Sequence, residues 1–372
     1  MGYRLTDEFY MKRALRLAKK AERWVSPNPM VGTVIVKNNR IIGEGFHEKF
    51  GGNHAEINAI QNSSESTNDS TIYVTLEPCA HYGKTPPCVE HLIALKPARV
   101  VIGTRDPNPL VCGKSIKALK RYGIKTTVGV LEEECQKLNE RFFKFIQSRL
   151  PFVTLKFAQT LDGRIATTQG DSKWISSLPS RRLAHKLRSI HDTVLVGVGT
   201  VLRDDPELTV RLIRGRNPVR ICVDSRLRIP LGAKILKHQN KARTIIATSR
   251  KADSKKWKRL TDMGIEVMAV DEDIHHHIDL KKLMAALGKK EISSILIEGG
   301  AGVISTVLRE QLADRAVVII APKIVGKGIE AVGDLGIRSM DNALQLTYRN
   351  KYTKGSDLII DVTVEKKDSR CT

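Results

Sequence analysis

The 372-residue sequence contains no apolar run long enough to cross a bilayer. Its first residues, MGYRLTDEFYMKRAL, carry charges too early for a secretory signal peptide. It has only six cysteines, and their spacing does not form the regular framework of a disulfide-rich secreted domain. These absences exclude the membrane-spanning and disulfide-stabilised secreted classes, and we expect a cytoplasmic protein.

Aromatic residues are scarce at 5% of the chain, and acidic residues are outnumbered by basic ones, 40 to 62. The resulting net charge of +22 favours a polyanionic ligand. The shortage of aromatics, however, counts against the stacking surface with which proteins bind single-stranded nucleic acids. The basic residues are scattered along the chain, and a phosphorylated small substrate and a phosphate-bearing cofactor would account for part of the excess.

The length favours two domains over one, because single hydrophobic cores rarely serve so long a chain. Hydrophobic residues make up 41% and charged residues 27%, as in ordinary globular proteins. Pro151 follows a helical stretch and indicates a boundary. We therefore expect one domain over residues 1–148 and a second over residues 149–372.

Residues 53–88 combine a His-x-Glu at the start of a helix with two Pro-Cys pairs further along. His54, Cys79 and Cys88 supply three zinc ligands and leave a fourth tetrahedral position open to water, as a catalytic zinc requires. Zinc lowers the pKa of bound water to about 7, and Glu56 is placed to carry the proton to leaving ammonia. The pattern predicts a zinc deaminase. A structural zinc site closed by a fourth protein ligand, for which His81 is a candidate, remains an alternative.

Strands alternate with helices along the chain, which predicts layered α/β sheets. We expect both metal-binding segments at helix N-termini, where the dipole favours thiolate over thiol. Residues 131–147 are expected to form one helix, and the glycines after TVLV in the second half are expected to form a turn. The turn around Gly299 would let backbone amides approach a phosphate, and residues 275–277, three histidines, are expected to be solvent-exposed.

Residues 1–148 resemble the cytidine deaminase superfamily. The loop EPCAHYGKTPPC has eight residues between its cysteines and is similar to the riboflavin-pathway pyrimidine deaminases, whereas nucleobase and tRNA deaminases carry Pro-Cys-x-x-Cys. SPNPMVG and DPNPLVCGK are similar to that family's substrate-side motifs. The resemblance implies a pocket lined by Asn28, His47, Asn53 and Asn108, although the family commonly has Pro at the position of Asn53.

The segments LKFAQTLDGRIA, WIS, LVGVGTVLRDDPELTVR, IEGG and IAPKIVG resemble the pyrimidine reductase of the same pathway, a dihydrofolate-reductase-like fold that uses NADPH. The resemblance implies that Lys156 and Glu298 handle protons, and Arg188 and Arg211 suit a ribose phosphate because a guanidinium can hold two of its oxygens. The implied NADPH contacts are Ala158, Trp174, Thr200, Asp204, Gly299, Gly300 and Gly302. The implied substrate contacts are Ser172, Arg188, Leu208 and Arg211, together with Glu298.

Together the two resemblances cover nearly the whole chain, in the order of the bifunctional riboflavin-pathway deaminase–reductases. They imply a cytidine-deaminase-like three-layer α/β/α domain followed by a dihydrofolate-reductase-like α/β domain. We expect zinc-dependent deamination of 2,5-diamino-6-(5-phosphoribosylamino)pyrimidin-4(3H)-one, then NADPH reduction of its ribosyl group to a ribityl chain. The expected partner is this small phosphorylated pyrimidine, with no nucleic acid or membrane, and a homo-oligomer is the expected assembly. A polynucleotide (tRNA) base deaminase with an accessory binding domain remains the alternative because of the charge.

Overall fold

The computed structural model describes residues 6–82 and 86–366, so residues 83–85 of the loop between the two cysteines lie outside the described part. The chain divides into two compact units, Met1–Arg149 and Leu150–Thr372. In the described residues, no helix is long and apolar enough to cross a membrane.

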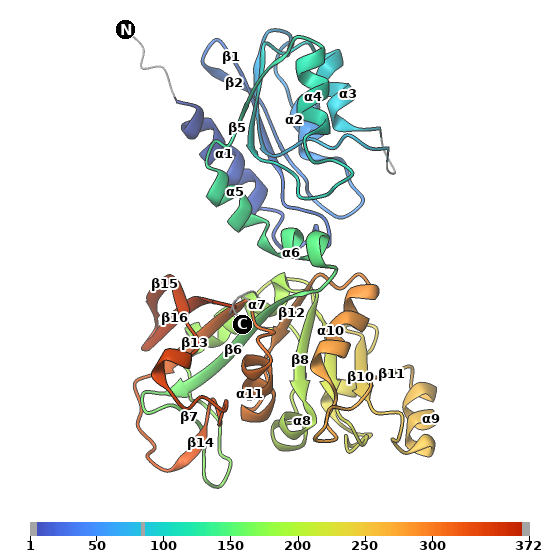
Figure 1. The fold of residues 1–372 in the computed structure, drawn as a ribbon, viewed down its shortest axis with the longest axis vertical. Helices are drawn as coiled ribbons and strands as arrows, with labels where there is room; N and C mark the ends of the chain where they lie inside the picture. Colours follow the sequence, from blue (N-terminus) through green and yellow to red (C-terminus); the bar gives the residue numbers. More distant parts are fainter. Residues whose placement is uncertain (1–5, 83–85, 367–372) are drawn as a thin grey trace. The chain divides into compact units, whose positions relative to one another are not determined.

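The first unit is built on a five-stranded sheet in the order β2-β1-β3-β4-β5 (Figure 1). β1 and β2 form the hairpin that the sequence predicts, and its turn residues Asn38 and Asn39 both adopt positive φ. β3, β4 and β5 pair in parallel, so their carboxyl ends lie at one edge of the sheet. The strands are β1 (Gly32–Lys37), β2 (Arg40–Phe46), β3 (Thr71–Leu76), β4 (Arg99–Thr104) and β5 (Lys125–Val128).

Helices cover both faces of this sheet, which gives the three layers expected from the sequence (Figure 1). α1 and α5 pack on one face, and α2, α3 and α4 pack on the other. α1 begins after Thr6, whose side chain accepts a hydrogen bond from the N–H of Phe9. The helices are α1 (Asp7–Lys19), α2 (Ala55–Gln61), α3 (Cys88–Ala94), α4 (Lys114–Arg121), α5 (Glu132–Leu138) and α6 (Glu140–Ser148).

The prediction of one helix over residues 131–147 is wrong, because the helix breaks at Asn139. The side chain of this buried residue accepts a hydrogen bond from the backbone N–H of Met30 at 2.7 Å and donates to its carbonyl oxygen at 2.9 Å. These bonds tie the chain between α5 and α6 to a segment 109 residues earlier, and local sequence periodicity carries no information about such a contact.

The second unit contains a nine-stranded sheet in the order β11-β10-β9-β8-β12-β6-β13-β16-β15 and a two-stranded sheet of β7 and β14. The large sheet is parallel from β11 to β13, and β16 and β15 complete it antiparallel. The strands are β6 (Phe152–Thr160), β7 (Arg164–Thr167), β8 (Thr193–Gly197), β9 (Val219–Val223), β10 (Thr244–Thr248), β11 (Glu266–Ala269), β12 (Ser294–Ile297), β13 (Arg315–Ala321), β14 (Gly328–Glu330), β15 (Leu346–Lys354) and β16 (Asp357–Val364).

Alternate residues of β8 enter different cores, as the two-residue period of a strand requires. Val194 and Val196 pack with α7, α8 and α9, whereas Leu195 packs with α10 and α11. The large sheet is therefore covered on both faces, consistent with its parallel strands. The helices are α7 (Leu178–Ile190), α8 (Val198–Asp204), α9 (Ser254–Asp262), α10 (Leu280–Lys289) and α11 (Ala301–Arg309), with short 3₁₀ turns η1 (Lys234–Leu236) and η2 (Met340–Asn342).

Two features of the second unit differ from the prediction. The glycine-rich stretch after β8 is the start of helix α8, not a turn, because Val198 and Val201 bury one face of it in the core. β15 is not predicted because its polar sequence, LTYRNKYTK, leaves it mostly exposed at the edge of the sheet. Both units are nevertheless α/β, as the sequence predicts.

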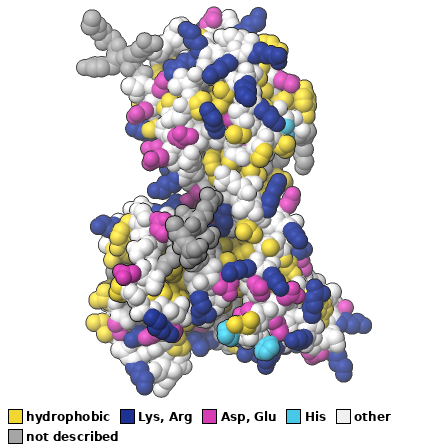
Figure 2. All heavy atoms as spheres, viewed as in Figure 1, with side chains coloured by type: hydrophobic (Ala, Val, Ile, Leu, Met, Phe, Trp, Pro, Cys, Tyr) yellow, Lys and Arg dark blue, Asp and Glu magenta, His cyan; other side chains and the backbone are white. Residues whose placement is uncertain are grey.

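One face of the molecule illustrates how the basic residues are distributed. On the face shown in Figure 2, Lys and Arg side chains are scattered among acidic and hydrophobic ones. This view agrees with the scattered distribution of basic residues along the sequence.

Candidate active sites

Three potential metal ligands come together at the carboxyl end of β3. His54 is the N-cap of α2, Cys88 is the first residue of α3, and Cys79 lies in the loop between β3 and α3. The Nδ1 atom of His54 lies 3.1 Å from Cys88 Sγ and 3.5 Å from Cys79 Sγ. Hydrogen bonds from Cys88 and His54 lower the pKa of the Cys79 thiol to about 4, so this residue is poised as a thiolate.

The donor set fits zinc. One imidazole nitrogen and two cysteine sulfurs lie within 4.8 Å of one another, and a single zinc ion with bonds of about 2.0–2.3 Å can reach all three. His81, the candidate for a fourth ligand, is exposed and is not part of the ligand group found among the described residues. Three protein ligands agree with the catalytic alternative and not with the closed structural one.

Glu56 lies beside the ligands on the first turn of α2 and is almost fully buried, with 3% of its surface exposed. Burial raises the pKa of this carboxyl to about 7, although the nearby His54 opposes the effect. A carboxyl that titrates near neutral pH can accept a proton and return it in the same reaction cycle. The position and the titration of Glu56 therefore suit proton transfer.

A cavity of about 270 Å³ opens onto these groups. Asn28, His47 and Asn108, all implied by the resemblance, line it, as do Glu56 and the ligands His54 and Cys79. His47 is held as a neutral ring because its Nδ1 donates to the carbonyl oxygen of Asn53 at 2.9 Å and its Nε2 accepts from the amide of Asn28 at 3.1 Å. Asn53 does not line the cavity, and it acts on the pocket through this bond to His47.

Sequence reasoning did not find two acidic residues of the same cavity, Glu77 and Asp106. The buried carboxylate of Glu77 accepts hydrogen bonds from the Ser115 hydroxyl at 2.7 Å and the Gly113 N–H at 3.0 Å. It thereby fixes the loop that carries Asn108. Burial raises the pKa of Asp106 to about 6. The position of Glu77 directly before the Pro-Cys pair was the available signal.

In the second unit, Glu298 joins two cations. It follows β12, and its carboxylate accepts hydrogen bonds from Lys156 Nζ at 3.4 Å and from Arg188 Nε and Nη2 at 2.6 and 3.1 Å. Burial alone would raise the pKa of Glu298, but the charges of Arg188 and Lys156 outweigh it and lower the pKa to about 2. Glu298 is therefore ionised at neutral pH.

A second cavity of about 270 Å³ lies at the carboxyl end of β12 and is bordered by β6 and α8. The Ser172 hydroxyl donates to Asp204 at 3.2 Å, and the Arg181 guanidinium stacks 4.1 Å from the centre of the Trp174 ring. Sequence reasoning missed Arg181 and Arg203, which also border the cavity. The predicted residues that line it are Lys156, Ala158, Ser172, Trp174, Thr200, Asp204, Glu298, Gly299 and Gly300.

The remaining predicted residues of this unit lie elsewhere. Leu208 is buried in the hydrophobic core, so its side chain is turned away from solvent. Arg188 is engaged with Glu298 and with the carbonyl oxygen of Thr209. Arg211 is half exposed and contacts Glu207.

Gly302 borders a larger cavity of about 530 Å³ between α8, β9 and α11. This cavity also receives Arg226, Arg228 and the three histidines of residues 275–277, which are exposed as predicted. A methyl group added at Gly302 would meet open space. The adjoining N-cap of α11 is Gly300, which has no side chain to cap the helix, so the first amides of α11 can receive an anion.

Family models match both parts of the chain. The cytidine and deoxycytidylate deaminase zinc-binding region matches residues 4–104, and the RibD C-terminal domain matches residues 151–360. The first model spans all three metal ligands, and the second spans Lys156, Arg188 and Glu298.

Two relatives, both named riboflavin biosynthesis protein RibD, match nearly the full length of this chain. The riboflavin biosynthesis protein RibD of Aquifex aeolicus is 46% identical over 95% of this chain and 97% of its own. The Escherichia coli protein is 37% identical over 96% of this chain and 99% of its own. A solved structure from Thermotoga maritima, named diaminohydroxyphosphoribosylaminopyrimidine deaminase/5-amino-6-(5-phosphoribosylamino)uracil reductase, is 38% identical, covers 96% of this chain and 99% of its own, and has a TM-score of 0.83.

Proposed function

This chain belongs to the RibD family of riboflavin biosynthesis proteins and is a bifunctional deaminase and reductase, and we propose that its substrates are those named for the Thermotoga maritima relative. The first unit would deaminate diaminohydroxyphosphoribosylaminopyrimidine. The second unit would reduce the product, 5-amino-6-(5-phosphoribosylamino)uracil. The observation that carries the proposal is the His54–Cys79–Cys88 cluster beside buried Glu56 in one unit, with the Lys156–Glu298–Arg188 group in the other.

In the deaminase unit, His54, Cys79 and Cys88 would hold zinc, which supplies the Lewis acidity that makes a water nucleophilic at neutral pH. Glu56 takes the proton from that water and delivers it to the amino group that leaves as ammonia. Asn28 and Asn108 offer the pyrimidine edge both donors and acceptors. Both ring nitrogens of His47 are already bonded, so His47 holds the Asn28 amide in place before the substrate arrives.

In the reductase unit, bound NADPH would supply the hydride for reduction at the anomeric carbon of the ribose. The ring oxygen leaves that carbon and needs a proton, which the ammonium group of Lys156 can give. Glu298 is ionised at neutral pH and has no proton to donate, so we assign it the role of holding Lys156 in place. Arg211 is half exposed and would hold the phosphate of the substrate.

The residues that would hold NADPH are those around the second cavity, namely Ala158, Trp174, Thr200 and Asp204, with Gly299 and Gly300 at the start of α11. Gly302 and the arginines Arg226 and Arg228 of the larger cavity suit its other phosphates, because amides at a helix N-terminus and guanidinium groups both bind phosphate. NADPH would therefore bind in the reductase unit, and zinc in the deaminase unit.

The alternative of a tRNA base deaminase with a binding domain is not favoured. The family match covers the deaminase and the reductase parts in one chain, and a polynucleotide deaminase would have no use for the Lys156–Glu298 group.

The test separates the two activities with one substitution. Cys79→Ala removes a metal ligand, so we expect loss of bound zinc, measured by atomic absorption, and loss of ammonia release. NADPH-dependent reduction of supplied 5-amino-6-(5-phosphoribosylamino)uracil should remain. The matched control is Cys135→Ala, which removes a free cysteine of the same unit that packs against α1 and away from the metal ligands, and it should change neither activity. Ammonia release that persists in Cys79→Ala after the zinc is gone would contradict the metal-dependent mechanism.

A further inference from the structure

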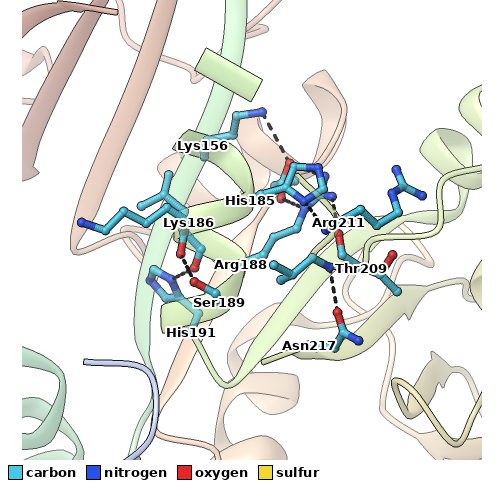
Figure 3. A network of polar contacts seen from close by, with 12 residues as sticks. Lys156, His185, Lys186, Arg188, Ser189, His191, Thr209, Arg211 and Asn217 are labelled. Carbon is cyan, nitrogen blue, oxygen red and sulfur yellow. Dashed lines mark hydrogen bonds and ion pairs between the residues drawn. The ribbon is translucent and has the colours of Figure 1, made fainter. Parts of the chain in front are cut away.

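The segment that carries Arg211 is held in place by hydrogen bonds to side chains, and not by the backbone hydrogen bonds of a helix or sheet. Residues 206–218 of the described chain form neither helix nor strand. Three successive backbone groups in it pair with side chains (Figure 3). The Thr209 carbonyl oxygen accepts from Arg188 Nη1 at 3.2 Å, the Val210 N–H donates to Asn217 Oδ1 at 2.7 Å, and the Arg211 N–H donates to His185 Nδ1 at 2.9 Å.

His185 and Arg188 lie three residues apart on α7, so both side chains project from the same face of the helix. Arg188 also binds Glu298, the partner of Lys156. One face of α7 therefore binds both the Lys156–Glu298 pair, through Arg188, and the segment that carries Arg211. The relative placement of these two groups depends on this face.

The hydrogen bond to Arg211 determines the state of the His185 ring. A ring nitrogen that accepts from an N–H carries no proton, so the proton of the imidazole lies on Nε2. His185 is buried, with 6% of the surface of the residue exposed. Arg188, Arg211 and Lys156 surround it with positive charge, against the single negative charge of Glu298. A second proton would break the bond to Arg211 and add a fourth cation to this group.

We propose that His185 is a positioning residue of the reductase: it fixes the backbone at Arg211 so that the Arg211 guanidinium meets the phosphate of the substrate. This inference rests on the reductase activity and the phosphate role proposed above. His185 acts through Arg211 and touches neither the hydride nor the proton that is transferred.

The test compares two polar substitutions that differ in where they place an acceptor. The Oδ1 atom of Asn can occupy the position of His Nδ1, whereas Gln in His185→Gln carries its amide one bond further from the backbone and loses the Arg211 N–H. Kinetics are measured with supplied 5-amino-6-(5-phosphoribosylamino)uracil in the full-length enzyme. We expect His185→Gln to raise KM about tenfold, the effect of losing roughly 1.4 kcal/mol of binding. We expect His185→Asn to stay within about threefold of the wild type, or roughly 0.7 kcal/mol.

Three further readouts separate positioning from general structural damage. The kcat value and the affinity for NADPH, measured by fluorescence titration, should be unchanged in His185→Gln. With the same substrate lacking its 5-phosphate, the KM values of the wild type and His185→Gln should converge. The matched control is His191→Asn, a change to another buried histidine near the end of α7, whose ring bonds the Leu187 carbonyl and the Thr154 hydroxyl instead of the Arg211 segment. It should leave KM unaltered.

Equal KM values for the two His185 variants, or a KM defect that persists on the substrate without phosphate, would overturn the inference. Both results leave the reductase activity of the wild type intact and so leave the proposed function standing. Failure of the proposed function is a different outcome, in which the wild type itself oxidises no NADPH with this substrate.

Discussion

The pKa values of two glutamates of this enzyme, Glu56 and Glu298, are shifted in opposite directions, and this difference indicates their roles. Glu56 has no cation bonded to its carboxylate among the described contacts, and burial raises its pKa to about 7. Glu298 is also largely shielded from solvent, with 9% of its side chain exposed, but Arg188 and Lys156 lower its pKa to about 2. Glu56 can therefore exchange a proton near neutral pH, whereas Glu298 serves as a fixed anion. The environment, not the residue type, separates the two functions.

Glu56→Gln keeps the size of the side chain and removes its ability to accept a proton. We expect ammonia release to fall at least about hundredfold, the usual contribution of a general acid–base group. Zinc content should stay at the wild-type level, because Glu56 is not a ligand. Reductase activity in the same chain provides the internal control. A deamination rate within about threefold of the wild type would remove Glu56 from the mechanism.

His185 predicts a pH-dependent stability. Burial lowers its pKa from 6.5 to about 4, with Arg188, Arg211 and Lys156 acting in the same direction and Glu298 against them. Between these values the unfolded chain binds more protons, so the free energy of unfolding falls as the pH falls. The contribution is fully present above pH 6.5 and is lost towards pH 4, by at most about 3 kcal/mol.

Calorimetry of the wild type and His185→Asn checks this effect. The stability advantage of the wild type should shrink as the pH falls from 7 to 4.5, because Asn does not titrate in this range. A difference that stays constant over that range would show that His185 binds its proton equally well in the folded and unfolded chains.

The metal-ligating residues could be predicted from the sequence. His54, Cys79 and Cys88 could be identified because few residue types bind zinc and their spacing is unusual, and the structure brings all three together. The contacts of Glu77 and His185 could not be predicted, because these side chains accept hydrogen bonds from backbone groups 36 and 26 residues away in the sequence. Such bonds leave no local pattern.

At the level of the elements, the break between α5 and α6 positions part of the deaminase cavity. Phe142 and Ile146 of α6 line the cavity, one helical turn apart. A continuous helix from Glu132 would carry these side chains along a different line. Asn139, which bonds both backbone groups of Met30, fixes the break.

Asn139→Ala should therefore lower the free energy of unfolding of the first unit by about 1–3 kcal/mol, because it leaves a buried N–H and C=O without their partners. Urea unfolding of the full-length chain measures this free energy. Hydrogen exchange of peptides from residues 132–148 measures the change at α5 and α6 themselves. The matched control Asn62→Ala alters an exposed residue whose amide bonds the Glu44 carbonyl, and we expect a change within about 0.5 kcal/mol. An equal effect of both substitutions would mean that Asn139 is not the residue that fixes the break.

Periodicity predicted most elements, since amphipathic helices and buried strands repeat at different intervals. The hairpin of β1 and β2 and the helix that begins at Cys88 are correct. The failures are elements decided by tertiary contacts. They include the α5–α6 break at Asn139, the helix α8, whose glycines indicated a turn, and the edge strand β15, whose exposed polar residues carry no burial signal.

At the scale of the whole molecule, the chain contains two α/β units with separate active-site groups and the activities of two reaction steps. The +22 charge favoured a polyanionic partner in the sequence, but no composition value could distinguish a nucleic acid from small phosphorylated ligands. The basic groups at the reductase cavities, Arg226 and Arg228 among them, offer phosphate-binding positions for part of the excess.

The central claim is that one chain deaminates the substrate and then reduces the deaminated product. Purified enzyme is incubated with diaminohydroxyphosphoribosylaminopyrimidine, with and without NADPH, and ammonia and NADPH are measured separately. We predict ammonia release without NADPH and, when NADPH is present, oxidation that follows the ammonia and approaches it in amount. NADPH oxidation that precedes ammonia release, or an absence of ammonia until NADPH is added, would contradict this account.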